Sequence, residues 1–252
     1  MKVAAIQHDI VWEDARSTCA ALEPMVAGAA ACGARLVVLT EMFATGFSMN
    51  PDKIVEPRGG PTDRWLVSQA QKHDIWICGS IPTAGDTNAK PVNRLVLAAP
   101  NGSTRHYDKI HPFTYSKEDE FYAAGSGHVT VEIEGILVSL FVCYDLRFAD
   151  EFWGLAHSTD CYVVVANWPE ARRLHWQTLL QARAIENQAY VIGVNRVGEG
   201  GNLVYAGDSR IIDPLGEILA AGARTEAILI AEIDAAKVAQ TRAKFPFLQD
   251  RR

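Results

Sequence analysis

The sequence predicts an α/β fold in which two mixed β-sheets pack face to face and helices cover both outer faces. Two observations carry this prediction. Strand-like apolar runs alternate with helical patterns along most of the 252 residues, and hairpin signals such as Pro100-Asn101-Gly102 interrupt the alternation. The chain has no internal repeat, low-complexity segment or linker, so we expect a single domain over residues 1–252.

Apolar and β-branched runs bounded by turn residues predict the strands. In chain order they cover residues 2–7, 35–39, 75–80, 92–98, 103–107, 129–133, 136–142, 161–166, 190–194, 208–212 and 227–233. Helical patterns cover 14–31, 62–73, 148–157 and 171–188, and a short helix and tail follow Asp234. We expect Pro24 to kink or split the first helix, because proline removes a backbone donor.

Two segments depart from simple patterns. Residues 108–128 have no regular periodicity, and a loop of that length inside a compact domain is usually functional. In the helix at 171–188 apolar and charged residues do not separate onto two faces. That pattern predicts a helix covered on one side by the sheet and on the other by a second subunit.

Composition restricts the class of protein and its surroundings. A net charge of −6, spread along the chain, gives no sign of a nucleic-acid surface. No segment approaches the ~18 apolar residues of a membrane span, and the run at 2–7 is too short for a secretory signal. The five cysteines are scattered and form no CxxC pair, so we expect a reducing, cytoplasmic location without disulfides or a zinc ribbon.

Cys143 is the candidate nucleophile. It follows the apolar run 135–142 directly and precedes Tyr144-Asp145-Leu146-Arg147, which opens a helix. A thiol on a strand-to-helix turn is held at the mouth of a sheet, where the next backbone N–H, that of Tyr144, can face a developing oxyanion. For the other four cysteines, at 19, 32, 78 and 161, we expect core packing.

Three charged residues are candidates for activating this thiol. Glu41 and Lys109 each follow a predicted strand, and Glu118 lies in the irregular segment. The ends of neighbouring strands converge at one sheet edge, so these groups can meet there. A carboxylate can take the thiol proton, and an ammonium can stabilise the oxyanion formed by attack.

Together these segments resemble the nitrilase superfamily of carbon–nitrogen hydrolases, whose signature is a Glu-Lys-Cys triad. The matching segments are Leu39-Thr40-Glu41-Met42-Phe43, Tyr107-Asp108-Lys109-Ile110-His111 and Phe141-Val142-Cys143-Tyr144-Asp145-Leu146-Arg147-Phe148. The resemblance extends over nearly the whole chain, from 4–7 to 212–217. It implies the four-layer αββα sandwich, and a homodimer or larger homo-oligomer paired through the helix after the nucleophile and the next one.

The resemblance also implies a role for each candidate. Glu41 would be the general base, Lys109 would stabilise the tetrahedral intermediate, and Cys143 would attack the amide carbon. The backbone N–H of Tyr144 would complete the oxyanion hole. Glu118, seven positions before a glycine as in the family, would position the substrate or assist proton transfer. No metal or organic cofactor is implied.

Within the superfamily, the stretches 166–176 and 182–190 are most similar to the omega-amidase branch, which hydrolyses the terminal amide of 2-oxo dicarboxylic acid monoamides such as 2-oxoglutaramate and 2-oxosuccinamate. A distal carboxylate needs a fixed cation, and a guanidinium suits it best. Arg172 is our candidate, ahead of Arg173. The aromatic side chains expected to wall the pocket are Phe43, Phe47, Phe113 and Trp168. A short aliphatic amidase or an N-carbamoyl amino acid hydrolase would use the same triad, and the choice between C4 and C5 chains stays open.

Two motifs and one further class compete with this interpretation. His106, Asp108 and His111 are residue types that bind zinc, but Pro112 and the preceding turn leave His111 unplaced. The stretch 198–202, Gly-Glu-Gly-Gly-Asn, lacks the third glycine and the helix of a dinucleotide loop, so we expect a turn between strands. A non-enzymatic binding protein on the same fold would be favoured by a missing triad member, and none is missing.

Overall fold

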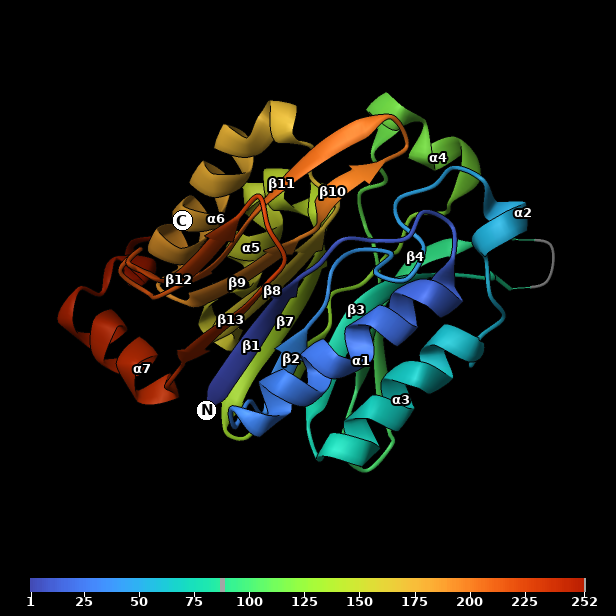
Figure 1. Cartoon of the computed structure of the whole chain (residues 1–252). Helices are drawn as coiled ribbons and strands as arrows, with labels where there is room; N and C mark the ends of the chain where they lie inside the picture. Colours follow the sequence, from blue (N-terminus) through green and yellow to red (C-terminus); the bar gives the residue numbers. More distant parts are fainter. Residues whose placement is uncertain (87–88, 252) are drawn as a thin grey trace.

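The computed structural model describes residues 1–86 and 89–251, and its centre is two β-sheets packed face to face (Figure 1). The first sheet has the order β13-β1-β2-β3-β4-β5. Its strands are β1 (Lys2–Gln7), β2 (Leu36–Val38), β3 (Trp76–Thr83), β4 (Val92–Ala98), β5 (Thr104–Asp108) and β13 (Ala227–Glu232). The β1–β2 and β2–β3 pairs are parallel and the other pairs are antiparallel.

The second sheet has the order β10-β11-β9-β8-β7-β6, and β12 also pairs with β11. Its strands are β6 (Thr130–Ile133), β7 (Ile136–Val142), β8 (Cys161–Ala166), β9 (Tyr190–Asn195), β10 (Val197–Gly200), β11 (Leu203–Ile212) and β12 (Ile218–Ala223). The central strands β7, β8 and β9 are parallel. They are almost entirely buried and rich in Val, as expected of strands covered on both faces.

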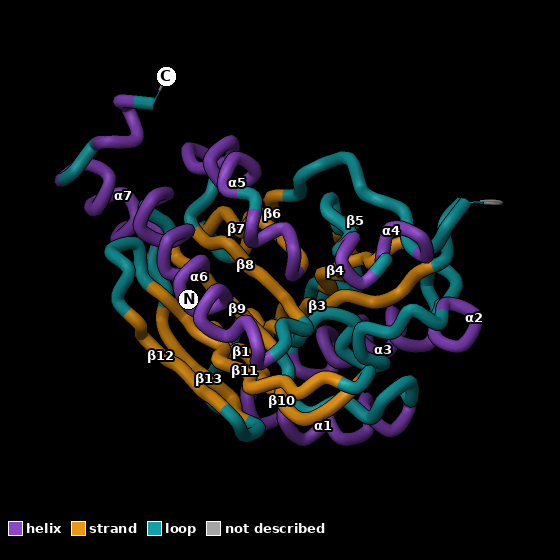
Figure 2. The backbone as a smooth tube through the Cα atoms, turned by 90° about the horizontal axis from the view of Figure 1, so that it is seen from above, coloured by secondary structure: helices purple, strands orange, loops and turns teal. Residues whose placement is uncertain are grey.

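Helices cover the two outer faces, which gives the four layers that the sequence predicts (Figure 2). The first sheet carries α1 (Ala15–Ala31) and α3 (Pro61–His73), and the second carries α5 (Ala149–Leu155) and α6 (Arg173–Asn187). The remaining helices are short or terminal: α2 (Pro51–Ile54), η1 (Thr114–Ser116), α4 (Glu118–Phe121), η2 (Cys143–Arg147), η3 (Ala156–Ser158), η4 (Glu170–Arg172), α7 (Ala235–Lys244) and η5 (Phe247–Asp250).

The inner faces of the two sheets share one apolar core. Val38 and Leu95 of the first sheet belong to the same buried cluster as Leu140 and Val163 of the second. A second cluster, which includes Leu22 and Leu66, lies between the first sheet and its helices. Burying these side chains contributes the main stabilisation of the sandwich and fixes the two sheets relative to each other.

The observed elements correct four expectations. Helix α1 runs without interruption through Pro24, so it is not split there; Ala20, whose carbonyl loses its donor, is exposed and accessible to water. Strands β10 and β12, which are short or partly exposed, were not predicted. The stretch 198–202 is the end of β10 and the turn that follows it. The segment 108–128 contains η1 and α4, and α4 begins at Glu118.

The strand directions bring several chain segments to one edge of the sandwich. Strands β2, β5, β7 and β8 all end there, and β4 begins there. Polar side chains that follow these strands therefore meet at this edge. In the described part of the chain, no helix combines the length and the apolar character needed to cross a bilayer.

Candidate active site

The Lys109 ammonium lies between two buried carboxylates. Its Nζ is 2.9 Å from Oε1 of Glu41 and 2.8 Å from Oε2 of Glu118. All three side chains are at most 1% exposed. Asn93, near the start of β4, donates from Nδ2 to both carboxylates, at 2.9 Å to Glu41 and 3.2 Å to Glu118. Two carboxylates thus share one ammonium and one amide in a buried environment.

Glu41 and Glu118 are each fixed by further backbone donors. The backbone N–H of Asn167, directly after β8, donates to Oε2 of Glu41 at 2.8 Å. The Asn167 side chain donates in turn to the Glu41 carbonyl. The N–H of Phe113 donates to Oε2 of Glu118 at 2.6 Å. Because each carboxylate oxygen has an assigned donor, the two side chains are held in one orientation.

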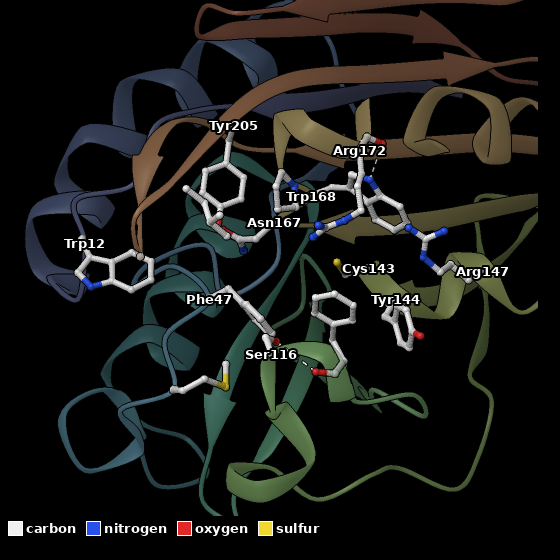
Figure 3. A pocket seen from close by; sticks show the side chains of 15 residues that line it. Trp12, Phe47, Ser116, Cys143, Tyr144, Arg147, Asn167, Trp168, Arg172 and Tyr205 are labelled. Atoms are coloured by element: carbon white, nitrogen blue, oxygen red, sulfur yellow. Dashed lines mark hydrogen bonds between the residues drawn. The ribbon is translucent and has the colours of Figure 1, made fainter. Parts of the chain in front are cut away.

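Cys143 lies at the end of β7 in a strained conformation. Its φ of 48° is in the left-handed region, where side chains other than glycine are uncommon. Asp145 holds this turn: its carboxylate accepts from the N–H of Val142 at 3.0 Å, the hydroxyl of Tyr107 at 2.8 Å and the N–H of His111 at 2.9 Å. The turn directs the Cys143 thiol into a cavity (Figure 3).

The electrostatics of the cluster keep the proton on the thiol. Desolvation, and after it the Glu41 carboxylate, raise the pKa of Cys143 well above its ordinary value, and the Lys109 ammonium opposes them only in part. Burial would lower the pKa of Lys109, but Glu118 and Glu41 outweigh it and raise that pKa. Burial raises the pKa of Glu118 against the influence of Lys109. The resting site therefore holds a protonated thiol beside a fixed carboxylate.

The cavity in front of Cys143 has a volume of about 290 Å³. Arg147 and Arg172 both line it, and each guanidinium lies against an aromatic ring: Arg147 is 4.7 Å from the centre of Trp168, and Arg172 is 5.5 Å from that of Phe113. The indole N–H of Trp168 donates to the carbonyl of Arg172 at 2.9 Å (Figure 3). Two cations are thus held in the pocket without a carboxylate partner among the described residues.

Most of the predicted residues meet at this site. Glu41, Lys109, Glu118 and Cys143 form one electrostatically coupled group. The predicted pocket residues that line the cavity are Tyr144, Arg172, Trp168, Phe47 and Phe113.

Phe43 was wrongly predicted to wall the pocket. It is fully buried and packs against Trp65, 5.7 Å between ring centres, in the core between the first sheet and its helices. The φ of 38° at Met42 turns the chain after Glu41, so residue 43 faces away from the cavity.

Two other candidates are accounted for by their contacts. Arg173 makes a bidentate ion pair with Asp208, at 2.8 and 2.9 Å, and does not line the cavity. In the zinc motif, Asp108 accepts two hydrogen bonds from Arg94. Within residues 1–86 and 89–251, no group of three or more His, Cys, Asp or Glu side chains is arranged to hold a metal ion.

Sequence reasoning missed three residues in the charged part of the site, and it also missed Trp12, Met49, Leu203 and Tyr205 of the cavity lining. Asn93 and Asn167 hold the carboxylates, and Arg147 is the second pocket cation. Asn167 follows the predicted strand 161–166 directly, as Cys143 follows the strand 136–142, so its position could have been used to predict a site residue. Asn93 lies inside a strand and offered no such signal.

Comparison with known proteins agrees with this geometry. A sequence model of the family described as carbon-nitrogen hydrolase matches residues 2–243. The chain belongs to the carbon–nitrogen hydrolase family. The hydrolase is 40% identical to the omega-amidase YafV of Escherichia coli K12 over 253 residues, which cover 99% of this chain and 96% of that protein. It is 36% identical to a 2-oxoglutaramate amidase of Bacillus subtilis strain 168, over 86% of this chain and 85% of the relative.

A solved structure gives the same result for the fold. The hydrolase superposes with a TM-score of 0.94 on XC1258 from Xanthomonas campestris, a CN-hydrolase superfamily protein with an arsenic adduct in its active site. The two chains are 37% identical, and the match covers 100% of this chain and 97% of that one. The predicted αββα sandwich is confirmed by this likeness and by the layers of the hydrolase itself.

The cluster predicts a pH-dependent cost for removing Lys109. Lys109→Met leaves two buried carboxylates without their cation, so we expect the free energy of unfolding to fall by about 3–5 kcal/mol near neutral pH. Without the ammonium the pKa of Glu118 rises further above its ordinary value, so the folded variant binds a proton that the unfolded chain releases. The difference in free energy of unfolding between the variant and the wild type therefore becomes smaller as the pH falls below neutral. Denaturant unfolding at neutral and at mildly acidic pH measures this.

Lys117→Met is the matched control. That ammonium is 69% exposed and pairs with Glu120 at 3.4 Å on the surface, so its removal should change the free energy of unfolding by less than about 1 kcal/mol. If Lys109→Met lowered the free energy of unfolding equally at both pH values, the interpretation that Glu41 and Glu118 share the Lys109 ammonium would be contradicted.

Proposed function

We propose that this hydrolase is a thiol-dependent omega-amidase that cleaves the terminal amide of 2-oxo dicarboxylic acid monoamides to the dicarboxylate and ammonia. The observation that carries the proposal is the combination of one ammonium between two carboxylates, a strained cysteine beside them, and two arginines across the same cavity. The names of the relatives from Escherichia coli and Bacillus subtilis support the substrate class.

In the acylation step, the Cys143 sulfur attacks the amide carbon while Glu41 takes the thiol proton. The raised pKa of the thiol makes this base necessary, since little thiolate forms without it. An ammonium has three N–H donors, and two of those of Lys109 are used by Glu41 and Glu118. The third stabilises the oxyanion together with the N–H of Tyr144, which lies at the start of η2 where backbone donors lack helical partners.

The tetrahedral intermediate then collapses. The C–N bond breaks, Glu41 gives its proton to the leaving nitrogen, ammonia departs and a thioester on Cys143 remains. Water attacks the thioester, Glu41 accepts a proton from it, and the C–S bond breaks as the thiol is restored. Glu118 keeps Lys109 and the backbone at Phe113 in place through both steps.

The side of the cavity that carries Arg147 and Arg172 recognises the acyl group. A carboxylate matches a guanidinium fork, and Arg172 is held there by Trp168 and Phe113. Arg147, four residues after the nucleophile, offers a second fork for the same carboxylate or the 2-oxo group. This pair favours a substrate with a charged distal end over a simple aliphatic amide.

We also propose that the hydrolase forms a homodimer or larger homo-oligomer and works in the cytoplasm. Leu174 and Ile185 on α6 are 69% and 47% exposed, as expected of a helix covered by another subunit. All five cysteines are free, which suits a reducing compartment.

Replacing the nucleophile should abolish turnover without unfolding the chain. In an ammonia-release panel with 2-oxoglutaramate, 2-oxosuccinamate, glutamine, asparagine and simple amides, we expect the wild type to prefer the two 2-oxo acids. Cys143→Ala should release no ammonia above background and should keep the wild-type melting temperature, because the turn is held by the Asp145 carboxylate and not by the thiol. Normal turnover by this variant would refute the nucleophile, and a preference for simple amides would refute the substrate class.

Removing Arg172, the proposed partner of the distal carboxylate, should selectively impair turnover of substrates that carry this carboxylate. We expect Arg172→Ala to lower kcat/KM for 2-oxoglutaramate by about 10- to 150-fold, the range of 1.5–3 kcal/mol for a charged hydrogen bond, with little effect on an uncharged amide. Arg172→Lys keeps the charge but not the fork, so it should recover only part of the loss. Equal losses of kcat/KM for charged and uncharged amides would exclude Arg172 as the partner of the distal carboxylate.

A further inference from the structure

The cavity has two chemically different ends. Arg147 lies at one end, and Trp12 lies at the other, with Cys143 between them in the view of Figure 3. The apolar side chains of Phe47, Met49 and Leu203 line the same cavity, and so does Tyr205, which lies between Trp12 and Trp168 in the view of Figure 3. We call these four residues, Trp12, Phe47, Met49 and Leu203, the apolar alcove. An amide that releases only ammonia carries no apolar group on its leaving nitrogen with which to fill it.

Phe47 of the alcove lies beside Lys109, which pairs with the proposed base Glu41. The Lys109 ammonium lies 5.1 Å from the centre of the Phe47 ring, and it forms an ion pair with Glu41. Asn167, whose N–H is bonded to the same carboxylate, also lines the cavity. Because Glu41 gives its proton to the departing nitrogen, that nitrogen faces these groups while the acyl carboxylate faces the arginines.

The walls of the alcove are fixed in place. A Cβ at Gly46, Gly200 or Gly201 would lie only 2.8, 2.7 or 2.9 Å from the Trp12 ring, so the indole is seated directly on glycine backbone. Leu203 is 44% exposed and covers the outer edge from β11. A rigid aromatic wall with an apolar edge suits a short alkyl group rather than water.

We propose that the apolar alcove binds the amine side of the substrate, so that the hydrolase also cleaves omega-amides whose nitrogen carries a short alkyl group. This proposal rests on the omega-amidase function above. Cys143 attacks the same carbon, the C–N bond breaks, and the alkylamine leaves with the proton held by Glu41. Water then hydrolyses the thioester, so one amide and one water give the dicarboxylate and the alkylammonium ion.

The test compares three amides that yield the same acid. The substrates are 2-oxosuccinamate, its N-butyl derivative and its N-(3-aminopropyl) derivative, and chromatography of the common product oxaloacetate gives kcat/KM for each. The butyl and aminopropyl chains have the same length and differ by a terminal ammonium. We expect N-butyl turnover to exceed N-(3-aminopropyl) turnover by about tenfold or more, because an apolar pocket discriminates on that scale.

A negative charge placed in the alcove should remove this preference. Leu203→Asp puts a carboxylate at the alcove edge, so the butyl-to-aminopropyl ratio should fall by about tenfold or more. Val204→Asp is the matched control: the neighbouring residue is equally exposed, at 50%, but does not line the cavity, so the ratio should keep its wild-type value.

Three outcomes would overturn the proposal. Cleavage of 2-oxosuccinamate alone, equal rates for the two N-substituted amides, or the same ratio in both aspartate variants would each refute the alcove while leaving the omega-amidase function intact. Turnover of none of the three amides would contradict both.

Discussion

The sharing of one buried ammonium by two carboxylates is the interaction on which the rest of the site depends. Lys109 is at most 1% exposed, and its only charged neighbours within 4 Å among the described residues are Glu41 and Glu118. Removing such charges from water is costly, so the arrangement persists only because donors from Asn93, Asn167 and the backbone satisfy it. The remaining negative charge is what makes Glu41 a base for the neighbouring thiol.

The fold supplies that arrangement through strand direction. Four strands of the two sheets end at one edge, so residues distant in sequence arrive at one point with their backbones fixed by the core. At the same edge Asp145 holds the turn at Cys143 in its strained conformation by three separate donors. The fixed strands and the Asp145 hydrogen bonds thus allow Cys143 to keep its strained backbone conformation, as in other strand-to-helix elbows.

Much of this was predictable from sequence, for reasons that differ by residue. Glu41, Lys109 and Cys143 follow predicted strands, which allows them to meet at one sheet edge, and the resemblance to three ordered family motifs is what groups them. Asn93 was not predictable, because a polar residue inside a strand looks the same whether it supports a site or a turn. Phe43 was mispredicted because the left-handed conformation of Met42 turns the Phe43 side chain away from the cavity. No residue type in that segment indicates a left-handed conformation.

The central claim is that this carboxylate-rich cluster keeps the proton on Cys143 until a substrate arrives. The most direct test is the ultraviolet thiolate absorbance of the wild type minus that of Cys143→Ala, followed from neutral pH to about 8.5, the ordinary pKa of a cysteine thiol. The account predicts no difference over that range, because the pKa of Cys143 lies well above it. A thiolate signal at neutral pH that the alanine variant lacks would contradict it.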